Sequence, residues 1–197
     1  MNSGTMISEQ QFRAAIAPEQ VRAMRIQQVA LATGLVLFAG AIAFLASQSP
    51  QRTTPTAAAT HLIARGSWIH SAVFVAGWFV SDVLFSAKLR RARQTAMQPG
   101  LGIARSGSVT PASSAQPYWI AIREAYTLRL ALREAPALFG SAVCFLAMQN
   151  GVLAAHPVAA LNFGSSAAAV AYFIATLPNE ERLVAAYRKH LAQSPTR

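Results

Sequence analysis

Residues 130–150 read LALREAPALFGSAVCFLAMQN. This stretch begins with a charged pair, Arg133 and Glu134, and continues as a long apolar run. A helix needs roughly 20 apolar residues to cross a bilayer, so the run is long enough to do so. Residues 29–46 resemble the stretch closely but lack its charges. The sequence therefore predicts a transmembrane helix with an earlier counterpart.

The composition is that of a membrane protein. The chain has 197 residues, of which 53% are hydrophobic and only 12% are charged, about half the charged share of a soluble domain. Its apolar residues gather in four windows of span length: 29–47, 68–86, 135–155 and 158–177. We predict an all-α polytopic membrane protein with four transmembrane helices. The remaining loops are short and polar, so we expect neither a core outside the spans nor a sizeable catalytic domain.

The segments between the spans indicate how the chain is organised. Pro18 predicts a helix start that runs into the first span, and roughly 28 polar residues before that span argue against a cleaved signal peptide. Two stretches, residues 118–134 and 179–191, read as interfacial amphipathic helices, of which the first either lies in the interface or leans against the bundle. The predicted segments are a cytoplasmic N-terminal segment (1–28), a first transmembrane hairpin (29–86), a basic flexible cytoplasmic linker (87–117), an amphipathic segment with a second hairpin (118–177) and a cytoplasmic amphipathic tail (178–197).

The basic residues predict the orientation. Of the 17 Lys and Arg residues, three precede the first span, eight lie from Lys88 to Arg133 and four lie in the tail, whereas the first loop has only Arg52 and Arg65. Cytoplasmic loops carry the excess of basic residues. We therefore predict a cell-membrane protein with both termini in the cytoplasm. Because topology explains the net charge of +10, we expect its partner to be anionic lipid headgroups and not nucleic acid.

The two similar stretches suggest an internal repeat. At an offset of 101, eight of 18 aligned residues are identical, including the Leu-Phe pair at 37–38 and 138–139. Each copy opens a hairpin in the same orientation, which predicts two parallel repeats. Two readings stay open: a duplication, or convergence of two helices with the same packing needs.

Small and polar residues within the spans predict helix packing. Small side chains recur about one turn apart in the first span (Ala30, Gly34, Ala39, Ala43) and in the fourth (Ala160, Gly164, Ala168), a pattern that lets helices approach closely. Asn162, Ser165 and Ser166 are expected to hydrogen-bond between helices. Cys144 reads as a packing residue. His70 and His156 lack a third ligand, so we predict no metal site and no cofactor.

Four charged residues are the candidate site for ions or polar coupling: Glu134, Asp82, Arg133 and Arg129. Glu134 has no opposite charge three or four residues away on its own helix, so it is expected to meet water, headgroups or a base such as Lys88 or Arg90. It is either an interfacial tether or a titrating carboxylate in an ion path. Asp82 is either paired with Arg129 or Arg133 or part of a proton relay.

The run from Glu134 to Gly140, EAPALFG, resembles the ion-carrying helix of the proteolipid subunit c of rotary ATP synthases. In that family a similar run places the proton-binding carboxylate in the membrane, and a vacuolar-type relative has a duplicated hairpin with one carboxylate lost. The resemblance implies a proton-binding role for Glu134 alone. Subunit c carries its carboxylate on the second helix of a hairpin, whereas Glu134 opens one. A similar motif is also compatible with uncharacterised four-span bacterial proteins.

No phosphate loop, HExxH, GxSxG or CxxC motif occurs in the sequence, and we expect no catalysis. The first hypothesis is a structural or accessory membrane protein that oligomerises or packs against a membrane protein partner. The second is a small proton or ion translocator that uses Glu134. An enzyme acting on lipid comes third.

Overall fold

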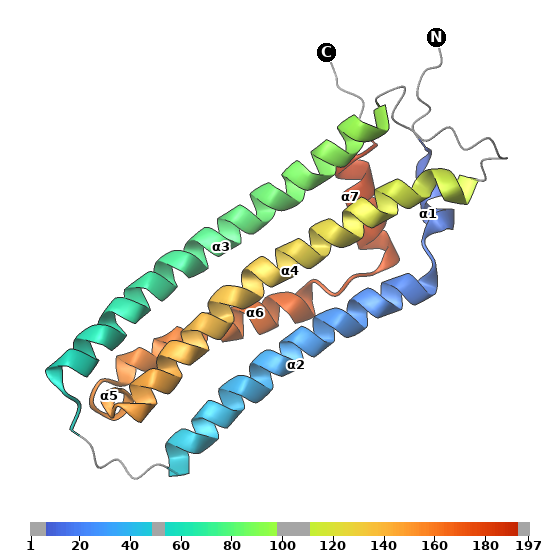
Figure 1. Cartoon of the computed structure of the whole chain (residues 1–197). Helices are drawn as coiled ribbons and strands as arrows, with labels where there is room; N and C mark the ends of the chain where they lie inside the picture. Colours follow the sequence, from blue (N-terminus) through green and yellow to red (C-terminus); the bar gives the residue numbers. More distant parts are fainter. Residues whose placement is uncertain (1–6, 49–53, 98–110, 193–197) are drawn as a thin grey trace. The chain divides into compact units, whose positions relative to one another are not determined.

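The computed structural model describes residues 7–48, 54–97 and 111–192 (Figure 1). Within these ranges the chain forms helices and no strand. The helices are α1 (Glu9–Ala15), α2 (Pro18–Gln48), α3 (Ala57–Met97), α4 (Pro111–Gln149), α5 (Val152–Ala155), the 3₁₀ helix η1 (Pro157–Phe163), α6 (Gly164–Ala175) and α7 (Glu180–His190).

Four helical stretches are long and apolar enough to cross a membrane: Pro18–Gln48, Ala57–Thr95, Ala115–Gln149 and Pro157–Ala175. Each contains one of the four predicted windows or most of it. The all-helical prediction is therefore confirmed, and the fold is compatible with a multi-pass membrane protein. α2 begins at Pro18, as predicted, because proline is preorganised for the first turn of a helix.

The amphipathic segment that precedes the third span is continuous with it. α4 is one helix of 39 residues, which starts at Pro111 and runs through Pro136 without a break. The helices on either side of the predicted linker also reach into it, α3 to Met97 and α4 from Pro111. The rest of that linker, residues 98–110, lies outside the described residues.

The chain divides into two compact units. The terminal unit comprises residues 1–26, 82–129 and 178–197, and the apolar unit comprises residues 27–81 and 130–177. α2, α3 and α4 each contribute residues to both units. Charge separates the two sharply, because the apolar unit contains only Arg52, Arg65, Arg133 and Glu134 as charged residues. The unit that is poor in charge is therefore the one suited to a bilayer.

The terminal unit has a hydrophobic core, contrary to the expectation that nothing outside the spans would bury one. Phe12, Leu89, Trp119, Leu183 and Tyr187 are among its buried residues, each 0–1% exposed. The sequence interpretation failed because the core draws a few apolar residues from each of several polar segments. No single segment is apolar enough to reveal it.

α1 and α7 pack against each other within this unit. The rings of Phe12 and Tyr187 stack with centroids 4.3 Å apart, and the Tyr187 hydroxyl donates to the Ile7 carbonyl at 2.6 Å. Arg13 donates to Glu180 at 2.8 Å and to Glu181 at 2.7 Å. α7 was predicted as a short amphipathic helix, and it begins after Asn179, whose side chain accepts from the Arg182 amide.

In the apolar unit, α4 packs against α3, α6 and α2. A Cβ atom on Gly77 of α3 would lie 3.0 Å from the Leu132 carbonyl oxygen, and one on Gly140 of α4 would meet the Asn162 carbonyl oxygen and His70 Nε2. Ala137 of α4 packs with Leu35 of α2. These two glycines allow the close helix approach that small residues provide in membrane proteins.

The small residues predicted to pack the first span do not do so within the described chain. α2 buries Gln28, Ala32, Leu35 and Ile42, which share one face. Gly34 lies on an exposed surface, and a Cβ atom there would meet nothing within 4 Å. The spacing alone did not show which face of α2 turns inward.

The fourth span begins as a 3₁₀ helix. Gly151, at φ 68°, ends the turn after α4 in a left-handed conformation that suits glycine, and η1 then starts at Pro157. The Asn162 side chain donates to the Ala159 carbonyl at 2.9 Å. The Ser165 hydroxyl can donate to the Asn162 carbonyl at 3.0 Å. Side chains thus satisfy carbonyls that irregular backbone leaves open.

Candidate functional site: a caged arginine and a histidine network

Arg133 is the most enclosed charged residue described in the apolar unit, only 2% exposed. Its guanidinium carbon lies 4.3 Å from the centroid of the Trp78 ring and 3.9 Å from that of Tyr172. The two rings meet edge to face, with centroids 5.4 Å apart. Arg133 Nε donates to Ser81 Oγ at 3.0 Å. Four groups from α3, α4 and α6 therefore form one cage, which we call the arginine cage.

The cage lowers the cost of burying a cation. Arginine stacks on aromatic faces better than lysine does, and a desolvated cation–π contact is worth about 2 kcal/mol or more. Ser81 is oriented in turn, since its hydroxyl lies 2.8 Å from the Trp78 carbonyl. The sequence interpretation placed Arg133 among the candidates but missed Trp78, Ser81 and Tyr172. The spacing of Trp78 and Ser81, three residues apart on one helix face, was a signal that could have paired them.

Glu134 lies beside the cage in sequence but on another side of α4. Its side chain is half-buried. In the part of the chain that the structure describes, no hydrogen bond or ion pair joins its carboxylate to another residue. Lys88, one of its predicted partners, lies 2.9 Å from Glu124 instead. Glu134 thus remains available to water, headgroups or another chain.

Asp82 and Arg129 form an ion pair in the terminal unit. Arg129 Nη2 lies 2.6 Å from Asp82 Oδ1, and the guanidinium also stacks over the Phe85 ring at 5.0 Å. The sequence predicted that Asp82 would pair with Arg129 or Arg133, and the structure contains the first pair. Among the four candidates the structure thus contains a caged cation, an ion pair between Asp82 and Arg129, and the half-buried carboxylate of Glu134.

A second polar cluster, the histidine network, surrounds His70 of α3. His70 is 4% exposed, with Nδ1 at 2.8 Å from Asn162 Oδ1 and Nε2 at 2.9 Å from Ser165 Oγ. Asn162 Nδ2 donates to Ser67 Oγ at 2.8 Å. Beside the network, Ser141 and Ser166 lie 2.8 Å apart. The prediction that Asn162, Ser165 and Ser166 bond between helices is confirmed.

The network fixes the direction of its hydrogen bonds. The Ala159 carbonyl can only accept, so the group of Asn162 that lies 2.9 Å from it is the amide nitrogen. Asn162 Oδ1 therefore faces His70, and Nδ1 of the ring carries the donated proton. Ring Nε2 lies 2.9 Å from the Ser165 hydroxyl, whose single proton can be donated either to Nε2 or to the Asn162 carbonyl at 3.0 Å. Every polar side-chain atom of His70 and Asn162 thus has a partner inside the protein.

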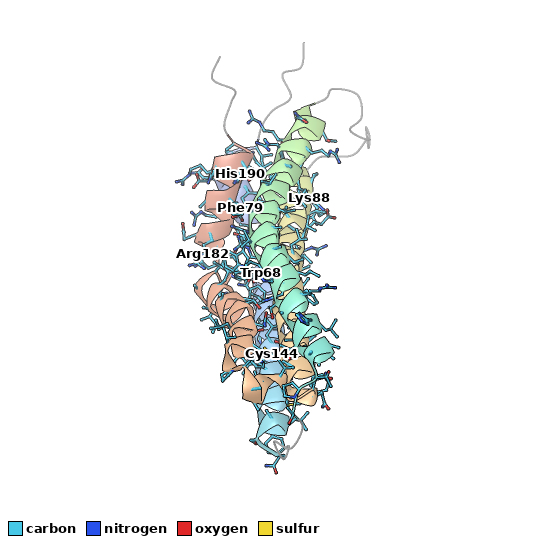
Figure 2. The ribbon with its side chains drawn as sticks, turned by 90° about the vertical axis from the view of Figure 1, so that its left-hand side faces the viewer. Trp68, Phe79, Lys88, Cys144, Arg182 and His190 are labelled. Carbon is cyan, nitrogen blue, oxygen red and sulfur yellow. The ribbon has the colours of Figure 1, made fainter. Side chains whose placement is uncertain are left out.

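A pocket of about 780 Å³ lies against this network in the apolar unit. Its wall is formed by residues of α3, α5, η1 and the start of α6, and it includes Ser67, Ser71, Phe74, Val75, His156 and Leu161. Trp68 of α3, labelled in Figure 2, also lines it and is 79% exposed. No Lys, Arg, Asp or Glu side chain lines the pocket.

The described residues contain no group of three or more His, Cys, Asp or Glu side chains that could hold a metal ion. His70 and His156 both line the pocket, and Cys144 is buried with its thiol 3.4 Å from the Ala159 carbonyl. The sulfur therefore packs beside η1. Comparisons of the chain with protein-family models, with curated proteins and with solved structures found no match.

Proposed function

We propose that this chain is a multi-pass membrane protein that has a structural or accessory role and no catalytic activity of its own. The arginine cage carries the proposal. Two aromatic faces and a serine hydroxyl enclose the Arg133 side chain. Such a residue holds three helices in one arrangement. The distribution of polar groups around His70, all bonded inside the protein, supports the same role.

The orientation in this proposal has both termini and residues 98–110 in the cytoplasm. The terminal unit carries most of the Lys and Arg residues, which favours the cytoplasmic face and contact with anionic headgroups. In this arrangement α2–α3 and α4–α6 are two hairpins that follow each other in parallel. Reporter fusions after Arg197 and within residues 49–53 test the orientation. A reporter fused after Arg197 that is active only outside the cytoplasm would overturn the proposed orientation.

The exposed side of α2 supports assembly with another membrane helix, from a second copy or a different protein. Ala30, Gly34 and Ala43 are exposed there, and small residues let helix backbones approach closely in lipid. In the proposal, this face of α2 binds the partner helix. Exchanging Gly34 for leucine should lower the assembled fraction in crosslinking of native membranes, while Ile69→Leu on exposed α3 should not.

The structural role of the cage is tested with Arg133→Met and Arg133→Lys, using exposed Arg65→Met as the matched control. We expect both Arg133 variants to lower the thermal midpoint in detergent and the amount of protein in the membrane. Lysine should rescue little, since it lacks the planar group that stacks on Trp78 and Tyr172. An unchanged midpoint for Arg133→Met would remove the argument for a structural cage.

A second candidate function is proton or ion translocation by Glu134. The observation that favours it is the lack of a described hydrogen-bond or ion-pair partner for its carboxylate, together with the resemblance of residues 134–140 to the proteolipid motif. A carboxylate that titrates in lipid reacts with hydrophobic carbodiimides. Modification of Glu134 that increases as the pH falls and the carboxylate takes up a proton would favour this function, whereas a carboxylate that resists the reagent favours the accessory role.

A further inference from the structure

The pocket beside the histidine network has the features of a ligand site. Its volume of about 780 Å³ lies within the range of small-molecule pockets, roughly 300–1,000 Å³, which combine apolar walls with a few polar groups. Phe74, Val75 and Leu161 supply apolar wall, and Ser67, Ser71 and His156 supply polar atoms. We infer that this pocket binds an uncharged amphiphile from the bilayer, one with an apolar body and a polar end that donates a hydrogen bond.

The ligand is uncharged because the wall offers no counter-charge. Neither a basic nor an acidic side chain lines the pocket, apart from the two histidines. Transfer of an ionised headgroup into such surroundings is costly unless an opposite charge meets it. Phospholipid headgroups and fatty-acid carboxylates are therefore disfavoured relative to alcohols of the same chain length.

The polar end is a donor because the hydroxyls of α3 have already used their protons. Thr60 donates to the Thr56 carbonyl at 3.2 Å, Ser67 to that of Ile63 at 3.0 Å and Ser71 to that of Ser67 at 2.9 Å. Asn162 already donates to the Ser67 oxygen, so the acceptors that this wall offers are chiefly the oxygens of Thr60 and Ser71. A ligand hydroxyl can donate to one of them and accept from the His156 ring, which has no hydrogen-bond partner in the described part of the chain.

Gly164 offers a way to close the pocket without disturbing the fold. It lines the pocket, has helical φ −56° and ψ −34°, and a Cβ atom there would meet nothing within 4 Å. Gly164→Leu therefore places a side chain on an open side of α6. Ala131→Leu is the matched control, because Ala131 of α4 is exposed and lines none of the pockets described.

The test uses photoreactive long-chain probes with one common chain that end in a hydroxyl, a methyl ether or a carboxylate. The full-length protein is labelled in phosphatidylcholine nanodiscs. We expect saturable labelling of pocket residues by the alcohol and about three- to tenfold weaker binding of the ether, which lacks the donor. Gly164→Leu should abolish the labelling and Ala131→Leu should leave it. Thr60→Val with Ser71→Ala should remove the advantage of the alcohol over the ether.

The inference rests on the proposed placement in the membrane, and the experiment separates the two. If alkaline carbonate extracts the protein from native membranes, the placement itself fails. If the protein stays in the membrane but the three probes label it equally, or Gly164→Leu labels like the wild type, the pocket is not this site and the inference is wrong.

Discussion

Arg133 Cζ lies 3.9 Å from the centroid of the Tyr172 ring, so a cation on α4 is held against an aromatic ring on α6. Trp78 of α3 covers the same guanidinium at 4.3 Å. These contacts join three helices at one buried charge. Removing either ring would expose the cation to an apolar environment with fewer compensating contacts, which raises the cost of its burial.

Trp78→Leu should destabilise the protein by about 2 kcal/mol or more, since it removes one cation–π face and leaves a cavity. Phe79→Leu is the matched control, because Phe79 is the next residue on α3 and is 72% exposed (Figure 2). It should change stability by about 0.5 kcal/mol or less. Thermal unfolding in detergent measures both. Equal losses in the two variants would show that the cage does not stabilise the bundle.

Gly140→Ala should be far more damaging than its single methyl group suggests. The new Cβ atom would meet the Asn162 carbonyl oxygen and lie 2.5 Å from His70 Nε2 and 2.6 Å from Ser165 Oγ, so α4 or the histidine network must shift. We expect a loss of about 1–3 kcal/mol or failure to accumulate. Gly34→Ala is the control and should be neutral or stabilise α2. A stable, folded Gly140→Ala protein would show that the helices are less closely packed here.

Acidification should loosen α1 from α7. Hydrogen bonding from Arg188 lowers the pKa of Glu9, and hydrogen bonding from Arg13 lowers that of Glu181, each from the ordinary value of 4.5. A lowered folded-state pKa gives stability that is present above pH 4.5 and is lost as the pH falls through the folded-state value. Amide hydrogen exchange of residues 9–15 should therefore accelerate in this acid range. Arg13→Gln should exchange faster at neutral pH and respond less to acid.

His190 should give the terminal unit a second pH dependence. Its ring packs 5.8 Å from that of Phe85, and burial, followed by Lys189, Arg90 and Arg129, lowers its pKa from 6.5. The unfolded chain then binds the proton more tightly, so stability is lost as the pH falls from about 6.5 towards the lower folded-state pKa. His190→Gln should remove this loss, and exposed His61→Gln should retain it. Unfolding followed between pH 7 and 5 compares the three proteins.

The sequence was sufficient to predict four spans, because a run of apolar residues as in 29–47 is a local property. The sequence also predicted that α2 starts at Pro18. It predicted α7 as well, because Asn179 marks the start of that helix and basic residues mark its last turn. It could not predict the core around Trp119 and Tyr187. That core depends on which distant polar segments meet, and such contacts leave no periodic pattern in any one of them.

The candidate site was predicted only in part, for a related reason. Arg133 and Asp82 were evident because charges near apolar runs are rare. The partners of Arg133 were not, since Trp78 and Tyr172 read as ordinary apolar residues of two other helices. His70 was considered only as a metal ligand and set aside for want of a third ligand, and its hydrogen bonds to Asn162 and Ser165 were not predicted. The sequence shows which residues are charged or aromatic. Which of them face one another depends on how each helix is rotated about its axis.

Proton flux into liposomes containing the purified full-length protein distinguishes a structural bundle from a translocator. A pH-sensitive dye records uptake under an imposed potential for the wild type, Glu134→Gln and empty liposomes. If the protein is a structural or accessory bundle, all three traces coincide, while Arg133→Met lowers the thermal midpoint. Flux in the wild type that is absent in Glu134→Gln would contradict the account and establish Glu134 as a translocating carboxylate.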